Sequence, residues 1–140
     1  MSVETREINF RTKGNSDIVD ITDKIATELE TCKIRNGVVT MFVPGSTAAL
    51  STIEYERGVV SDLNGALERL IPSGISYKHN LAWDDGNGHS HVRASLIGPS
   101  LSVPIVKGNM TLGTWQQIVF IDFDNRSRNR IVIIQVVGEE

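Results

Sequence analysis

Two apolar runs near the carboxyl terminus constrain the fold more than any other part of the chain. The runs IVFIDFD (118–124) and RIVIIQVVG (130–138) are rich in branched and aromatic residues, which favour β-strands. They flank the polar segment 125–129, and this pattern predicts a β-hairpin with a charged tip. Arg126, Arg128 and Arg130 gather at that tip, where they either face solvent or contact a phosphate or another subunit.

The rest of the chain predicts more strands, separated by turn residues. Ile8 and Phe10 alternate with polar residues, which is typical of a half-buried strand, and Gly37 to Val43 reads as a central strand ended by Pro44. The further expected strands cover residues 3–11, 37–43, 48–55, 101–106 and 110–112.

Helical periodicity appears in two long segments, 17–34 and 56–71, where apolar residues recur every three or four positions. Segment 91–97 predicts a short helix capped by Ser90, after a glycine-rich loop. Because strands and helices are partly segregated, we expect an α+β fold rather than a doubly wound α/β fold. With 140 residues and no repeat or linker, we expect one domain over residues 1–140.

Composition excludes several classes of function. The formal charge is −3, the calculated pI is about 5.6, and no basic stripe with interleaved aromatic residues is present, so we expect no nucleic-acid partner. No apolar run approaches the roughly 20 residues of a membrane helix, and no secretory signal is visible. A single cysteine, Cys32, suits a reducing compartment. We therefore expect a cytoplasmic protein without a membrane partner.

All three histidines, His79, His89 and His91, fall in one window beside Asp84 and Asp85. Neutral imidazole binds zinc and similar ions, and histidine exchanges protons near neutral pH. The two rings of a His-x-His pair point to one side only where the backbone is extended. The window is therefore either a metal or acid–base site, or a polar loop whose histidines bond to the backbone.

A second candidate lies in VPGSTAA (43–49), directly after a predicted strand. Gly45 permits close approach of a ligand, Ser46 and Thr47 add hydroxyl groups, and successive backbone N–H groups in such a turn can hold an anion such as phosphate. It lacks the Gly-Lys-Ser/Thr of a Walker loop. An ordinary turn is the alternative. Arg93 either reaches a phosphate through its guanidinium or pairs with a nearby aspartate.

Two other segments carry isolated polar or aromatic candidates. Glu54 interrupts a largely apolar strand, where it either lies at a solvated end or is held for a partner such as a cation. The segment LGTWQQ (112–117) places Gly113 before Trp115 and Gln116. Trp115 either stacks on an aromatic ligand or packs in a core or interface.

Several stretches together resemble the secondary thiamine-phosphate synthase (YjbQ-like) family. They are GNGHSHVRASLIGPSLSVPI, GNMTLGTWQQIVFIDFD, the closing RIVIIQVVGE and the upstream STAALSTIEYE. The resemblance covers nearly the whole chain, and SHVRAS followed by LGTWQ is a distinctive combination. It implies a β-sandwich-like core of mixed sheets with two main helices packed on it, and a homotrimer with sites near subunit boundaries.

The resemblance also implies an activity, in which hydroxymethylpyrimidine diphosphate condenses with a thiazole phosphate and releases pyrophosphate. Two phosphorylated precursors need cations, so we expect a small phosphorylated substrate and a divalent metal, zinc or magnesium. The alternative is a metal- and phosphate-binding trimeric protein that acts on a different phosphorylated metabolite.

The implied site is carried over residue by residue. The expected catalytic residues are His79, His91, Glu54 and Arg93. The expected metal ligands are His79, His89 and His91, and the expected ligand-binding residues are Gly45, Ser46, Thr47, Trp115 and Gln116. Many family members carry a histidine where this chain has Gly45, and His89 stands where they have none. His89 is therefore a candidate to replace the lost ligand.

Overall fold

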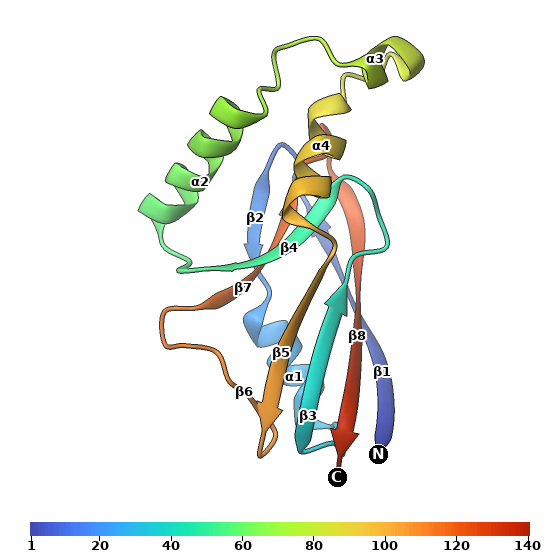
Figure 1. The fold of residues 1–140 in the computed structure, drawn as a ribbon, viewed down its shortest axis with the longest axis vertical. Coiled ribbons are helices and arrows are strands. Elements are labelled where there is room, and N and C mark those ends of the chain that lie inside the picture. Colours follow the sequence, from blue (N-terminus) through green and yellow to red (C-terminus); the bar gives the residue numbers. More distant parts are fainter.

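A computed structural model describes residues 1–140 as two antiparallel sheets and four helices (Figure 1). The strands are β1 (Ser2–Thr12), β2 (Asp17–Asp20), β3 (Asn36–Phe42), β4 (Ala48–Ile53), β5 (Ser100–Val106), β6 (Asn109–Met110), β7 (Gln117–Asp122) and β8 (Arg128–Glu139). The helices are α1 (Thr22–Glu30), α2 (Arg57–Leu70), α3 (Lys78–Trp83) and α4 (Gly88–Ile97). The expected α+β class is confirmed.

The larger sheet has the strand order β1-β8-β3-β5-β6. Strands β1 and β8 pair over their whole length, from Ser2 opposite Gly138 to Thr12 opposite Arg128. Both chain termini therefore lie together at one end of the molecule, and α3 lies at the other end (Figure 1). Strand β3 lies between β8 and β5, as expected for a central strand. Every strand pair is antiparallel, so the expectation of mixed sheets was wrong.

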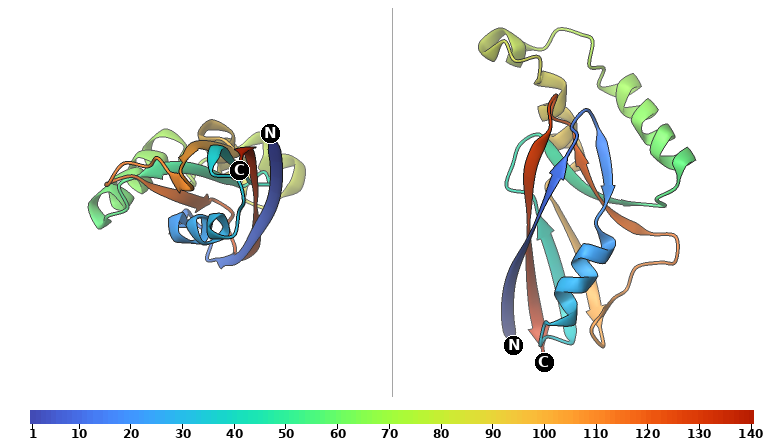
Figure 2. Two further views of the ribbon diagram at one scale, coloured as in Figure 1. Left: turned by 90° about the horizontal axis from the view of Figure 1, so that it is seen from below. Right: turned by 180° about the vertical axis from the view of Figure 1, so that it is seen from behind.

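Helix α1 covers the inner face of this sheet, as the view from behind shows (Figure 2). Its buried residues Ile25 and Leu29 join a core that includes Val132, Ile134 and Val136 of β8. Apolar residues alternate between inside and outside along β8, because only one face of this sheet is covered. The alternation therefore positions each even-numbered residue of this part of β8 toward the interior.

The smaller sheet, with strand order β2-β7-β4, is buried on both faces. Ile118 and Phe120 of β7 belong to the core shared with the larger sheet, whereas Val119 and Ile121 pack with residues of α2 and α4. This double burial explains why β7 is continuously apolar rather than alternating. Phe120 also makes an edge-to-face contact with Phe10, with ring centroids 5.0 Å apart.

The predicted hairpin between residues 118–123 and 130–137 was wrong. Strand β7 pairs with β2 and β4, whereas β8 pairs with β1 and β3 in the other sheet. The segment between them carries the chain from one sheet to the other. Local sequence identified both strands, but the choice of partner depended on which faces could be buried together.

The predicted helix over 17–34 was also wrong at both ends. Residues 17–20 form strand β2, in which Ile18 lies opposite Ile121. The helix proper covers only Thr22–Glu30. The backbone N–H of Ile21 donates to the carbonyl of Ile118 at 2.9 Å. The residues expected to form the first turn of the helix therefore pair with β7 instead. Ile18 fits the helical stripe by spacing but packs as a strand residue.

The histidine window contains two helices where a loop and a short helix were expected. Helix α3 was not predicted, and α4 begins at Gly88, with Asn87 rather than Ser90 as its N-cap residue. Gly88 is required because a Cβ there would lie 2.4 Å from Cβ of Tyr77. None of the four helices is long and apolar enough to cross a membrane.

Candidate functional site

Helices α3 and α4 bring two of the three histidines together. The rings of His79 and His91 lie with centroids 4.3 Å apart and planes tilted by 40°. An Oδ1 atom of Asp85 lies 3.3 Å from Nδ1 of His79. That nitrogen is buried and lacks a hydrogen bond of good geometry, so its proximity to Asp85 is a contact rather than a formed hydrogen bond. The pair is half-buried, at the rim of the molecule.

A cleft of about 180 Å³ adjoins His91 and connects it to the loop between β3 and β4. Gly45 and Ser46 line one side, and His91 and Ser95 of α4 line the other, with Ala48, Ala94 and Pro99 completing the wall. Two segments that sequence analysis selected separately, the histidine window and the VPGSTAA loop, therefore share one cavity. This convergence defines the candidate site.

The loop beside this cleft has unused hydrogen-bond donors. The backbone N–H groups of Ser46 and Thr47 make no hydrogen bond within the chain, and neither does the Ser46 hydroxyl. The N–H of Gly45 is used, because it donates to the carbonyl of Val43 at 2.9 Å. Two successive free amides and a free hydroxyl are the donor set of an anion-binding turn.

The hydroxyl of Thr47 is not among the available donors. It donates to Oδ2 of Asp124 at 3.0 Å and accepts from Nη2 of Arg130 at 2.8 Å. Thr47 is buried. Its side chain therefore anchors the loop to the sheet, and its carbonyl does the same by accepting from the backbone N–H of Phe123 at 2.9 Å.

A buried network of alternating charges lies beneath this loop. Arg130 binds both carboxylate oxygens of Asp122, at 2.7 and 2.8 Å, and Arg128 pairs with Asp124 at 3.0 Å. Burial by itself raises the pKa of Asp124, but the hydrogen bonds from Arg128 and Thr47 outweigh it and hold that pKa below its ordinary value. Arg128 and Arg130 are therefore members of a structural network rather than a solvated hairpin tip.

Sequence reasoning did not select these aspartates, although a signal was present. Asp122 and Asp124 interrupt the apolar run IVFIDFD at alternate positions. A carboxylate in a strand that is otherwise buried needs a positive partner nearby. The alternating arginines that follow in the sequence supply that partner.

Arg93 is buried and bonded within the chain through all three nitrogens of its guanidinium group. Nε and Nη2 donate to the carbonyl of Ile71 at 3.0 and 2.8 Å, Nη2 also donates to Glu68, and Nη1 donates to Ser16 at 2.9 Å. The expected pairing with Asp84 or Asp85 was wrong, because Glu68 is the partner. Arg93 ties the end of α2 to α4 and to the turn before β2.

His89 does not join the other two histidines. It is buried, and its nearest ring neighbour is Tyr77, at 6.4 Å between centroids. Residues two apart on an α-helix are separated by about 200° around its axis, so His89 and His91 diverge. Burial lowers the pKa of His89, and the positive charge of Arg93 lowers it further. Both effects favour the neutral form of His89.

The remaining expected residues lie at the opposite end of β4 from the cleft. Gln116 donates to the hydroxyl of Thr52 at 3.1 Å, and Glu54 is exposed just beyond that strand end. Ala48, which lines the cleft, precedes Thr52 by four residues and is therefore roughly 13 Å from it along an extended strand. Trp115 is 74% exposed and belongs to neither core. Within a single chain, Glu54, Trp115 and Gln116 therefore lie far from the histidine pair.

The expected divalent metal has no preformed three-ligand site in the chain. No group of three or more histidine, cysteine, aspartate or glutamate side chains is arranged to hold a metal ion. His79, His91 and Asp85 approach this condition most closely, but they are not arranged as three ligands of one ion. We therefore assign no reaction step to a metal.

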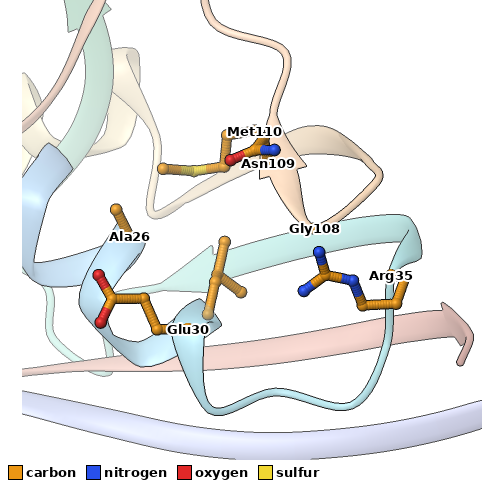
Figure 3. Close-up of a pocket in the computed structure, with 7 residues that line it drawn as sticks. Ala26, Glu30, Arg35, Gly108, Asn109 and Met110 are labelled. Atoms are coloured by element: carbon orange, nitrogen blue, oxygen red, sulfur yellow. The ribbon is translucent and has the colours of Figure 1, made fainter.

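A second hollow, of about 310 Å³, lies between the end of α1 and the turn that joins β5 to β6 (Figure 3). Arg35 and Glu30 lie at opposite sides of it, and Met110 lies above (Figure 3). The guanidinium of Arg35 donates to the carbonyl of Lys107 at 2.8 Å. No histidine and none of the expected site residues line this hollow. This hollow is therefore a weaker candidate for the functional site than the cleft at His91.

The two antiparallel sheets, with a histidine-lined cleft between a strand loop and a helix, define a small α+β protein with one candidate anion site. The family model for "UPF0047 protein YjbQ-like" matches residues 6–139, and the chain belongs to this family. This finding confirms the YjbQ-like part of the resemblance.

The chain is similar to proteins of archaea in both sequence and structure. It is 40% identical to a UPF0047 protein of Methanothermobacter thermautotrophicus over 139 residues, which cover 99% of this chain and 95% of that protein. A YbjQ-like protein of unknown function from Sulfolobus solfataricus superposes with a TM-score of 0.93 at 33% identity, over 99% of both chains. A hypothetical protein of Aeropyrum pernix gives a TM-score of 0.90 at 34% identity, over 97% of this chain and 99% of that one. These matches extend the shared fold over the whole chain.

Proposed function

We propose that the cleft beside His91 binds the phosphate of a small phosphorylated substrate and that the protein is a transferase of the thiamine-phosphate synthase type. The observation that carries this proposal is the meeting of His91 with Ser46, whose amide and hydroxyl are free, in one cavity, with the free amide of Thr47 next along the loop. A phosphoryl group has oxygens on several sides, and backbone amides, a hydroxyl and an imidazole supply complementary donors.

In the proposed reaction, the ring nitrogen of the thiazole phosphate attacks the methylene carbon of hydroxymethylpyrimidine diphosphate. A C–N bond forms, the C–O bond to the diphosphate breaks, and pyrophosphate leaves with the bonding electrons. Charge accumulates on the leaving group, so donors aimed at its oxygens accelerate the step. The amides at Ser46 and Thr47 and the ring of His91 are the groups we assign to that role, with the ring of His79 beside that of His91.

The size of the cleft favours a contribution from a neighbouring subunit. At about 180 Å³ the cleft is smaller than the roughly 300 to 1,000 Å³ of ordinary small-molecule sites. It accommodates a phosphate group but not two whole precursors. We propose a homotrimer in which a second chain extends the cavity. In support, large apolar side chains lie exposed near both groups of candidate residues: Leu81 at 80%, Trp83 at 73%, Leu96 at 71% and Trp115 at 74%.

The same size also suits the second candidate function, binding of a smaller phosphorylated metabolite by the trimer. That function needs the anion-binding turn and the histidine pair but not room for two precursors. Thermal-shift measurements with a panel of phosphorylated metabolites test it, since a ligand that binds the folded chain raises the melting temperature by an amount that grows with the logarithm of its concentration over Kd. A protein whose melting temperature responds to none of them contradicts this second candidate.

The transferase is tested by incubating purified protein with both precursors, with and without Mg²⁺ or Zn²⁺, and measuring thiamine phosphate by chromatography. We expect product from the wild type and none above background from the double variant His79→Ala, His91→Ala. Lys78→Ala, a change of an exposed neighbour of His79, is the matched control and should retain activity. Absence of product from the wild type under all metal conditions removes the transferase proposal.

The trimer is tested by light scattering on size-exclusion chromatography at micromolar concentration. We expect a mass three times that of the chain, which is 15.4 kDa. Trp115→Ser should shift the equilibrium toward smaller species if that tryptophan lies in the interface. A monomeric wild type at these concentrations contradicts the trimer.

A further inference from the structure

Arg130 lies at the inner side of β8, opposite Phe10 of β1, and its side chain is only 12% exposed. Asp122, which is fully buried, accepts two hydrogen bonds from Nε and Nη2 of this guanidinium. Nη2 also donates to Thr47, the residue that anchors the loop of the cleft. The position and the plane of the guanidinium are therefore fixed by three bonds before any ligand arrives.

The third nitrogen, Nη1, is free. It makes no hydrogen bond within the chain, and it is not among the buried atoms that lack a partner, so it reaches solvent. It lies against Gly45, where an added Cβ would be 3.2 Å away. Gly45 and Ser46 line the cleft at His91. The one unused nitrogen of Arg130 is thus placed beside the turn that carries the two free amides.

We propose that Arg130 is the charged anion-binding residue of this site, and that its Nη1 contacts an oxygen of a bound phosphoryl group together with the Ser46 and Thr47 amides. This inference rests on the proposed function, which supplies the phosphorylated ligand. Arg93, the basic residue that the family resemblance assigns to the site, has every guanidinium nitrogen engaged elsewhere. Arg130 is the cation whose donor adjoins the turn.

The buried aspartate determines what kind of donor Arg130 is. Asp122 offsets the charge of Arg130, so the attraction to an anion does not come from excess positive charge. It comes from a fixed N–H beside other fixed donors, which favours a tetrahedral oxyanion over a simple halide. The absence of a side chain at Gly45 leaves room around this nitrogen, because an added Cβ would lie 3.2 Å from it.

The test is isothermal titration calorimetry of the full chain with inorganic phosphate and with pyrophosphate. We expect Arg130→Lys to weaken binding at least about tenfold, because lysine keeps the charge but lacks the fork that presents Nη1 while Asp122 is bound. Arg128→Lys is the matched control, since it alters a neighbouring ion pair of the same type and should leave the affinity unchanged. Chloride at the same concentration should not compete.

Gly45→Ala provides a second variant that leaves all charges in place. Gly45 does not have a positive φ, so alanine suits its backbone, and the methyl group narrows the approach to Nη1. We expect it to weaken phosphate binding several-fold with a melting temperature close to that of the wild type. If Arg130→Lys fails to fold, Gly45→Ala decides, and an unchanged affinity in that variant overturns the inference.

The outcomes separate this inference from the proposed function. Phosphate binding by the wild type that Arg130→Lys leaves within twofold overturns the role of Arg130 only. A wild type that binds phosphate through Arg130 but forms no thiamine phosphate supports the inference and removes the transferase. A wild type that binds neither phosphate nor pyrophosphate overturns both.

Discussion

Replacement of Arg93 by methionine tests whether this residue stabilises the fold or binds the ligand. Methionine retains an unbranched apolar side chain of similar reach but removes all the hydrogen bonds of the guanidinium. The largest expected loss is at the carbonyl of Ile71, which accepts from Nε and Nη2 at 3.0 and 2.8 Å. This carbonyl is at the end of α2, where no further helical turn supplies a donor.

The magnitude follows from the burial of these groups. A buried carbonyl that loses its donors costs about 1–3 kcal/mol, and the side chain of Arg93 is only 5% exposed. Glu68 is more than half exposed, so its ion pair with Arg93 is screened by solvent and adds little. We expect Arg93→Met to lower the free energy of unfolding by about 2 kcal/mol, or roughly 5–10 °C in melting temperature for a chain of this size.

Chemical denaturation followed by circular dichroism, at one protein concentration, measures this loss. Arg69→Met is the control, because Arg69 is exposed near the end of α2 and makes no hydrogen bond within the chain. It should change the free energy of unfolding by less than about 0.5 kcal/mol. Phosphate titration of both variants completes the experiment, and neither variant should lose affinity.

A specific pattern refutes this reasoning. If Arg93→Met is as stable as Arg69→Met but no longer binds phosphate, the contacts with Ile71 and Ser16 contribute nothing measurable. Arg93 would then be a ligand-binding residue, as the family resemblance implies.

Three further predictions concern pH, the core and a turn. Because burial lowers the pKa of His89 below its ordinary 6.5, the unfolded chain takes up a proton that the folded chain does not, and the free energy of unfolding should fall as the pH drops below about 6.5. In denaturation measurements between pH 5 and 8, His89→Gln should reduce the dependence of this free energy on pH. An equal dependence in both proteins contradicts the assignment. Phe120→Ala should cost about 3–5 kcal/mol by denaturation, since the ring is fully buried between the two sheets; a loss under 1 kcal/mol would show that the sheets do not pack as described. Gly14→Ala should cost more than about 1 kcal/mol, because φ is +76° and a Cβ would lie 2.4 Å from the carbonyl oxygen of Arg126; an unchanged melting temperature would contradict this turn geometry.

The histidine window shows how far residue patterns reach toward the site. The sequence placed His79 and His91 among the candidates, and the structure brings their rings together. It also suggested His89, as a replacement for the family histidine that is missing at Gly45, which would need a backbone that turns His89 and His91 to one side. The window instead forms a helix, in which alternate residues diverge, so His89 lies elsewhere. The local conformation, which a glycine-rich segment specifies weakly, decided which histidines meet.

Arg93 and Arg130 show a second limit. Both are arginines near other candidates in the sequence, and the pattern favoured Arg93 because it follows His91 so closely. The bonding of each guanidinium depends on residues far away in the chain: Ile71 and Ser16 for Arg93, Asp122 and Thr47 for Arg130. Sequence distance contains no information on these partners, so only the folded chain distinguishes an engaged arginine from one with a free nitrogen.

The sequence by itself determined the α+β class, the positions of most strands and the two main helices, and it selected the histidine window and the loop at Gly45 as candidates. These properties are local, since side-chain periodicity and turn residues act over a few positions. The tertiary structure decided that β7 and β8 belong to different sheets, that residues 17–20 form a strand, and that the loop at Gly45 meets His91. Strand pairing depends on which apolar faces can be buried against one another, and that is a property of the whole chain.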